Sequence, residues 1–409
     1  MKRAASLVEP AGAAEAAGAA EADPARAPAG EAPAGEATSR RARFCPDLEV
    51  VGPVEDAGTG RPRLALYNRV TDTSYVLGQA EVTIARLFDG QRGPAEVLER
   101  ARAAVSPRLA AEKLAAFEHR LRSLGILVDA DSPAGEKPGS VKIRKDPFAG
   151  LSFGPLKAML LIPLINLRPD RYLDRLLRVA PWLVSRAFGA ASTALIAVAI
   201  GILASRWPAF SSEVVHAYTG WEWLLWHYPI MITSVICHEI GHTLPCKKYG
   251  VSITEMGFGA YFLFVTGWAR PVQREWVLLT RRQRMTTIIM GPFVSLVFSA
   301  VGVILWRLAA PGSVLAQLGA MMGVISTLAI IPTMLPIFNG DGYLFLTELI
   351  GIPALRQRSW QFVQDAVRGR PSRVGPVTAR RKALYCAVAA GTLASWALAW
   401  FGLYSLFFR

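Results

Sequence analysis

Two histidines and a glutamate near the middle of the chain have the spacing of a metal-binding helix. His238, Glu239 and His242 form the pattern HExxH. On an α-helix, positions i and i+4 lie on one face, so both imidazoles can bind the same metal ion. Glu239, one position further on, lies beside them and can hold a metal-bound water. The spacing therefore predicts a zinc centre with an adjacent carboxylate.

The residues before the motif are unusually apolar for a soluble zinc enzyme. Residues 226–237 contain no Lys, Arg, Asp or Glu. Ionisable groups at membrane depth are costly and are therefore usually functional. The alternative is a chance HExxH in a long chain, and the apolar setting disfavours it.

The elements that must position this motif are long apolar segments. Of the 409 residues, 52% are hydrophobic, and they gather in blocks of about the 20 residues that a helix needs to cross a bilayer. The expected spans are roughly residues 183–205, 223–244, 286–308, 314–336 and 384–407. The predicted fold is mainly α, a polytopic membrane helix bundle.

The net charge of +14 is distributed as in an oriented membrane protein. Lys and Arg gather at alternate span ends, as at residues 281–284, whereas the opposite ends carry little besides Arg206, Arg307 and Arg409. Positive charge stays in the cytoplasm, so the N-terminus is expected inside and the C-terminus outside. Residues 60–128 mix acids with arginines and present no clear basic face, so we expect a lipid bilayer and no nucleic acid as partner.

A catalytic zinc ion needs a third protein ligand. Cys246 follows the second histidine by four positions, but Pro245 is expected to end the helix before it. His216 and His227 are expected toward the other membrane face. Asp341 follows the fourth span at the expected cytoplasmic side, between two glycines that let the backbone bend. We therefore predict Asp341 as the ligand, the alternative being a solvated turn residue.

The N-terminal part has a different character. Residues 1–43 are rich in Ala, Gly, Pro and Glu and are expected to form a disordered tail. Residues 44–130 predict a small α+β domain of winged-helix type, with strands near residues 64–67 and 74–77. Its helices are expected after residue 80, from Pro94, and from Ser106-Pro107, the last with a buried stripe at Leu114, Phe117, Leu121 and Leu124.

A linker and the membrane domain follow. Residues 131–150 contain Pro, Gly and a basic run and are read as the linker, and residues 151–409 as the membrane domain with about five spans. Leu156 to Leu167 is apolar but short and is followed by several arginines. It predicts an interfacial helix more than a span.

Cys237 to His242, followed much later by Asp341-Gly342-Tyr343, resembles the site-2 protease group of intramembrane zinc metalloproteases. More narrowly, residues 150–409 resemble its bacterial branch of peptide zinc metalloproteases. The resemblance implies that His238, His242 and Asp341 bind Zn²⁺ and that Glu239 is the general base. It also implies an endopeptidase in the bacterial cytoplasmic membrane.

Three further segments carry this resemblance. Gly257-Phe258-Gly259, continuing to Pro271, resembles the membrane-facing hairpin of the family. Met290 to Ser295 resembles its Ala-Gly-Pro-x-x-Asn element, with Ser295 in place of the Asn. The candidate substrate-binding residues are Gly257, Phe258, Gly259, Ser295 and Asn339.

Residues 60–128 resemble the PqqD-like domain, a small module that holds leader peptides in peptide natural-product pathways. The matching residues are Tyr75-Val76-Leu77, Leu87 to Gly90, and the closing Leu121 to Leu127. The two resemblances together imply cleavage of a peptide or membrane-protein substrate near the cytoplasmic leaflet, in maturation or export of a modified peptide. The alternative is a catalytically silent membrane protein that binds peptide or metal.

Overall fold

A computed structural model describes residues 41–55, 62–131, 161–219, 221–261, 264–335, 340–352, 355–370 and 377–407. The chain divides into two compact units, Met1–Ala149 and Gly150–Arg409. The expected tail at residues 1–40 and most of the expected linker at 131–150 lie outside the described residues.

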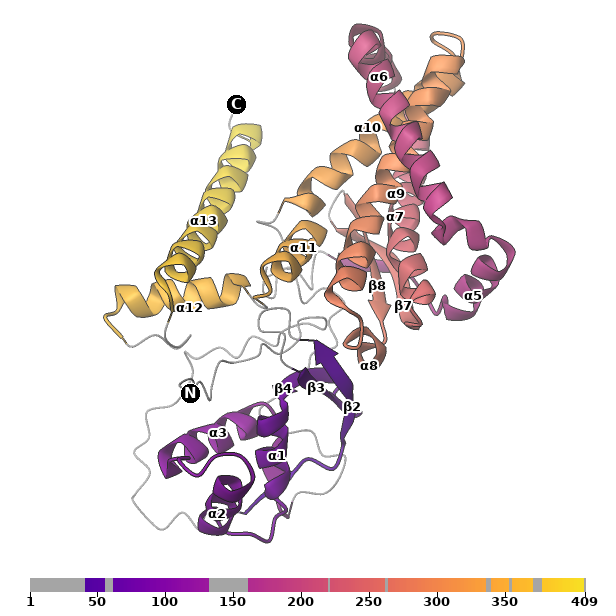
Figure 1. The fold of residues 1–409 in the computed structure, drawn as a ribbon. Coiled ribbons are helices and arrows are strands. Elements are labelled where there is room, and N and C mark those ends of the chain that lie inside the picture. The colour runs from indigo at the N-terminus through magenta and orange to yellow at the C-terminus, as the bar shows by residue number, and fades with distance from the viewer. Residues whose placement is uncertain are drawn as a thin grey trace. The chain divides into compact units, whose positions relative to one another are not determined.

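The first unit is a small α+β structure (Figure 1). Strands β2, β3 and β4 form an antiparallel sheet in that order, and β1 pairs with β5. Its elements in chain order are β1 (Ala42–Phe44), β2 (Leu48–Glu55), β3 (Pro62–Asn68), β4 (Thr73–Gly78), α1 (Gln79–Leu87), α2 (Pro94–Ala104), α3 (Ala111–Ser123) and β5 (Leu127–Asp129). The predicted strands and the helix beginning at Pro94 are confirmed.

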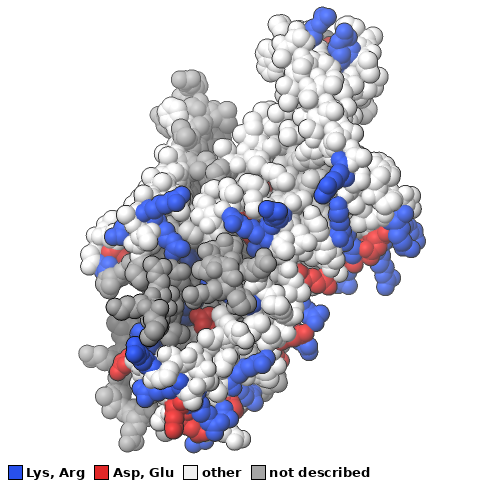
Figure 2. Space-filling view, viewed as in Figure 1, with Lys and Arg blue, Asp and Glu red and all other residues white. Residues whose placement is uncertain are grey.

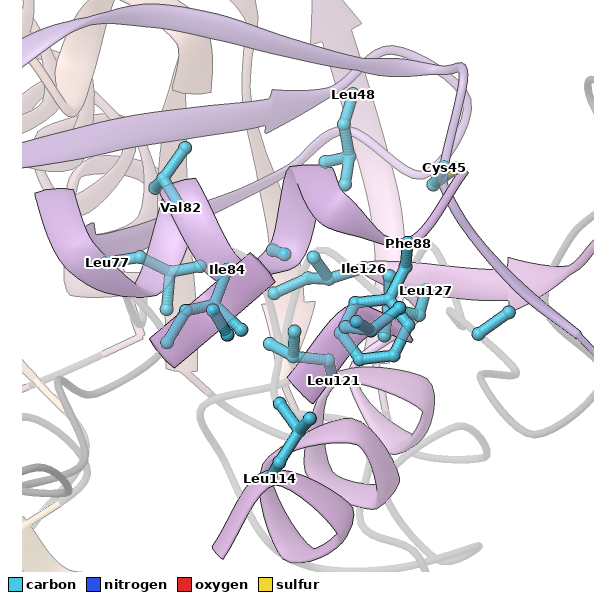
Figure 3. Close-up of a cluster of buried hydrophobic side chains, with 14 of the residues drawn as sticks. Cys45, Leu48, Leu77, Val82, Ile84, Phe88, Leu114, Leu121, Ile126 and Leu127 are labelled. Atoms are coloured by element: carbon cyan, nitrogen blue, oxygen red, sulfur yellow. The ribbon is translucent and has the colours of Figure 1, made fainter. Parts of the chain in front are cut away.

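The predicted start of the last helix is wrong. Helix α3 begins at Ala111, because residues 106–109 form a turn in which the Leu109 amide donates to the Ser106 carbonyl at 3.1 Å. Leu109, in this turn, is buried in the core of the unit. Leu114 and Leu121 are buried in a core with Phe88 and Ile126, as Figure 3 shows, and Phe117 and Leu124 pack at its edge.

The second unit is dominated by long helices. Among the described residues, three helices are long and apolar enough to cross a membrane: α6 (Arg186–Ala217), α9 (Arg281–Leu308) and α10 (Val314–Met334). Figure 2 shows a mostly uncharged surface in the region where α6 and α10 lie. The remaining two expected spans are also helical, in α7 (Trp223–Lys248) and α13 (Ala379–Phe407).

Small and hydroxyl-bearing residues hold α7, α9 and α10 together. A methyl group at Gly302 of α9 would lie 2.7 Å from the Gly319 carbonyl of α10, so the two backbones touch where glycines face each other. Ser234 of α7 and Ser326 of α10 are buried and hydrogen-bonded through their hydroxyls at 2.7 Å. Such contacts fix the position of one helix relative to the next where apolar side chains alone specify little.

The expected interfacial helix at Leu156 to Leu167 is wrong for its described part. Residues 161–167 form strand β6 (Leu161–Leu167), which pairs antiparallel with β7 (Ile253–Tyr261), and β7 pairs with β8 (Phe264–Pro271). The register shifts between Pro163 and Ile165, which accommodates a residue that lacks an amide donor. The predicted hairpin β7–β8 is confirmed, and β6, which the sequence does not predict as a strand, pairs with β7.

Shorter elements connect these parts. They are α5 (Asp170–Val179), the 3-10 helix η1 (Pro181–Val184), α8 (Gln273–Trp276), α11 (Asp341–Ile350) and α12 (Leu355–Val367). Tyr343 of α11 packs with Leu355 of α12 and Tyr385 of α13 in a buried cluster. The helix that begins at Asp341 is therefore held by the C-terminal part of the chain as well as by α9.

Candidate metal centre

Two elements far apart in the sequence supply the candidate ligands. His238 and His242 lie one turn apart on α7, and Asp341 is the first residue of α11. Close packing of α11 against the end of α10 brings the aspartate in, since a methyl group at Gly340 would lie 2.5 Å from the Thr333 carbonyl. The two glycines that flank Asp341 permit this approach.

The three side chains converge on one point. The Nε2 atoms of the two histidines are 3.1 Å apart, and the Asp341 carboxylate lies 3.0 Å from His238 Nε2 and 3.3 Å from His242 Nε2. Two ligand atoms bound tetrahedrally to one zinc ion lie roughly 3.3 Å apart, given bonds of about 2.0–2.1 Å. The observed separations fit a single shared metal ion.

Hydrogen bonds from α9 orient both imidazoles. His242 Nδ1 lies 2.9 Å from the Thr287 carbonyl, which can only accept, so Nδ1 is assigned as the donor. His238 Nδ1 lies 2.9 Å from the hydroxyl of Ser295, whose side chain is only 3% exposed. With Nδ1 held in this way, the Nε2 atom of each imidazole faces the other imidazole and Asp341. Metal-bound histidines commonly use one ring nitrogen for the metal and the other for such a hydrogen bond.

The charge state of Asp341 suits a metal ligand. Burial alone would raise the pKa of its carboxyl group, but the adjacent imidazoles and their hydrogen bonds outweigh burial and hold that pKa well below its ordinary value. A carboxylate must be deprotonated to bind a metal ion, so this charge state is the one that a ligand needs. We conclude that these residues could hold a metal ion.

Glu239 is buried beside the ligands. Its exposed fraction is 8%, and it faces β8, where a methyl group at Gly267 would lie 2.6 Å from Glu239 Oε1. Gly291 of α9 likewise leaves space for His242, because a side chain at position 291 would collide with the imidazole. The sequence does not predict these roles of Gly267 and Gly291, because a glycine that leaves space for another side chain has no characteristic spacing in the sequence.

The other residues considered as ligands do not belong to the group formed by His238, His242 and Asp341. Helix α7 continues through Pro245 to Lys248, so the prediction that Pro245 ends it is wrong. A proline in the last turn removes a single hydrogen bond, and the Tyr249 amide still donates to the Pro245 carbonyl at 3.0 Å. Cys246 is buried but does not join the three ligand atoms, and His227 bonds Tyr218 at 3.1 Å near the other end of α7.

The candidate substrate residues are not all at one place. Gly257, Phe258 and Gly259 lie in β7, the middle strand, so β6 and β8 already occupy both of its edges. Ser295 contacts the candidate ligand His238, so its position bears on the candidate metal site and not on the sheet. Asn339 lies outside the described residues. The edge of the sheet nearest Glu239 is β8, at Gly267.

A forked ion pair ties the helix of Asp341 to α9. The Arg284 guanidinium donates to both Glu348 carboxylate oxygens, at 2.8 and 3.0 Å, and to the Leu279 carbonyl at 2.6 Å. Arg281 donates to the Leu349 carbonyl beside it. Glu348 follows Asp341 by seven positions and so lies on the same face of α11. The pair therefore helps to set where Asp341 meets α7.

Breaking this pair should loosen the metal site. We expect Arg284→Glu and Glu348→Arg each to cost about 2 kcal/mol of folding stability, because each leaves a partly buried charge facing a like charge. Both single variants should also lose metal faster to a chelator. The double variant R284E/E348R restores the attraction and should recover both properties, as measured by thermal unfolding and metal release. Single variants that retain metal like the wild type would show that the pair does not position Asp341.

Comparisons of the chain with protein-family models, with curated proteins and with solved structures found no match.

Proposed function

We propose that the protein is a zinc-dependent intramembrane endopeptidase that cleaves a peptide or membrane-protein substrate near the cytoplasmic leaflet. The observation that carries this proposal is the convergence of His238, His242 and Asp341 within 4.8 Å of one another, with Glu239 buried beside them. Two imidazoles and one carboxylate are a donor set typical of catalytic zinc, which keeps a further position open.

The membrane setting is inferred from the helices around the site. Three of them are apolar enough to span a bilayer, and α7 packs against one of these through Ile230, Met231, Met321 and Ile325. We infer that α7 and α13 complete a bundle of five spans in the bacterial cytoplasmic membrane. The distribution of Lys and Arg supports a cytoplasmic N-terminus.

Each residue of the candidate site has a separate role in the proposed hydrolysis. When bound, a zinc ion acts as a Lewis acid toward a scissile carbonyl and activates a water molecule. Glu239 accepts the proton of the attacking water and passes it to the leaving amine. His238, His242 and Asp341 hold the centre, and Ser295 and the Thr287 carbonyl keep the two imidazoles in the required orientation.

The sheet provides a place for an unwound substrate. A helical segment hides its carbonyls in its own hydrogen bonds and must open before it can be cut. Within the described part of the chain, β8 is an edge strand of the sheet and reaches Glu239 at Gly267, so an opened segment could pair with it as an added strand. The PqqD-like character proposed for the N-terminal unit would suit a substrate delivered by its leader peptide, in maturation or export of a modified peptide.

Metal removal tests the proposal directly. The purified full-length protein, reconstituted in lipid, would be incubated with a library of peptides that each carry one apolar segment of about 20 residues. Half of the segments would contain Gly or Pro to ease unwinding. We expect fragments that disappear on chelation, return on adding Zn²⁺ and are enriched from the Gly/Pro half, as detected by mass spectrometry.

Two results would contradict the proposal. Fragments that persist in the chelator would exclude metal-dependent cleavage. A protein that carries one equivalent of zinc, binds the peptides and cuts none would be the catalytically silent binding protein instead.

A further inference from the structure

Helix α5 carries three separate faces. Leu173 is buried, and Leu176 and Leu177 pack beside it against the end of α7 and the start of β7. Arg171, Arg175 and Arg178 recur at i, i+4 and i+7 and form an exposed cationic stripe, which Arg168 extends. Tyr172 and Val179, also seven positions apart, form a third face and are 75% and 78% exposed.

The acidic residues of α5 are already paired. Lys247 of α7 donates to Asp170 at 2.8 Å and contacts Asp174 at 2.9 Å, and Asp170 also accepts from the Ile253 amide at 2.8 Å. Burial alone would raise the pKa of Asp170, but these hydrogen bonds outweigh burial and hold it below its ordinary value. Among the described residues, Arg171 and Arg175 have no carboxylate partner in an ion pair.

The position of α5 is set by its neighbours. It ends at Val179, η1 follows, and the candidate span α6 begins at Arg186. Trp182 of η1 is 56% exposed and stacks edge-on against Phe188 of α6, with ring centroids 5.2 Å apart. Figure 2 shows Lys and Arg gathered over α5, in contrast to the mostly uncharged surface over α6. An aromatic and basic segment at the start of a span is typical of the headgroup layer.

We propose that α5 and η1 form a binding surface for anionic phospholipid headgroups. Tyr172, Val179 and Trp182 enter the boundary of the acyl chains, and the stripe Arg168, Arg171, Arg175 and Arg178 binds lipid phosphates. Guanidinium groups suit phosphate oxygens because they donate two parallel hydrogen bonds. Exposed apolar side chains beside exposed arginines on one short helix fit a charged bilayer surface better than water.

The surface also bears on the metal centre. Lys247, which holds α5, lies on α7 five residues after His242. Lipid bound to α5 therefore braces the end of the helix that carries both histidines. The inference concerns lipid recognition and does not depend on whether the protein cleaves peptides.

The test uses the full chain in detergent, titrated separately with phosphatidylglycerol, phosphatidylcholine and inorganic phosphate. We expect phosphatidylglycerol to bind most tightly and to raise the unfolding temperature, as followed by native mass spectrometry and thermal unfolding. The variant R171Q/R175Q/R178Q should bind it about tenfold more weakly or worse, since each basic residue at a membrane surface contributes to the attraction. Its lysine counterpart R171K/R175K/R178K keeps the charge and should retain more of the binding.

A matched control removes the same charge from the N-terminal unit. R86Q/R100Q/R108Q changes three exposed arginines there and should bind phosphatidylglycerol like the wild type. The inference is overturned if both glutamine variants lose binding equally, if R171Q/R175Q/R178Q binds like the wild type, or if inorganic phosphate produces the same stabilisation as the lipid. The thermal shift in phosphatidylcholine shows whether each variant is folded.

Discussion

Glu239→Gln should leave the metal content of the protein unchanged and lower the rate of peptide cleavage by at least about a hundredfold. Glutamine has nearly the same size as glutamate, so it fits between α7 and Gly267 of β8 without displacing either. It cannot accept a proton, however, and Glu239 is not one of the three convergent ligands. The expected result is therefore a loss of turnover with intact binding of metal and peptide.

Glu222→Gln is the matched control, because Glu222 is exposed and immediately precedes the other end of α7. It makes the same chemical change just before the start of the same helix and should cleave like the wild type. Metal content by elemental analysis and cleavage rate by mass spectrometry would be measured on the same preparations. A Glu239→Gln protein that cuts at the wild-type rate would remove Glu239 from the proposed mechanism.

The convergence of His238, His242 and Asp341 could be predicted from two kinds of signal, one local and one topological. The spacing of His238 and His242 places both on one face of any helix that contains them. Asp341 is almost a hundred residues further on, and only the alternation of spans and basic tracts indicated that it returns to the same side. The close agreement at this site comes from two simple regularities, helical periodicity and the orientation of charged tracts.

The parts that could not be predicted depend on contacts between distant segments. Residues 161–167 are apolar and short, which fits a strand or an interfacial helix equally well until the hairpin β7–β8 offers an edge. Gly267 of β8 and Gly291 of α9 leave space for Glu239 and His242, and both of these side chains lie on a different element, α7. Likewise, the pairing of Arg284 with Glu348 joins residues 64 positions apart, and nothing in either segment specifies the other.

The replacement Asp341→Ala should abolish stable metal binding. The variant loses one of three candidate ligands and keeps two imidazoles. Loss of a residue that only hydrogen-bonds a ligand typically weakens metal binding by about 10–100-fold. We therefore expect Asp341→Ala to weaken metal binding by more than this, as measured by competition with a chelator. Asp341→His offers a nitrogen donor at the same position and should retain more metal than the alanine variant.

Asp131→Ala, which removes an exposed carboxylate from the N-terminal unit, should keep the wild-type metal content. Thermal unfolding separates a lost ligand from a lost fold. Without metal, the Asp341→Ala protein should unfold near the temperature of the metal-free wild type, whereas added Zn²⁺ should stabilise the wild type far more than the variant. Full occupancy in a folded Asp341→Ala protein would assign the third ligand elsewhere. Since Glu239→Gln is expected to spare metal and Asp341→Ala to spare the base, the two variants together distinguish a faulty catalyst from a missing metal site.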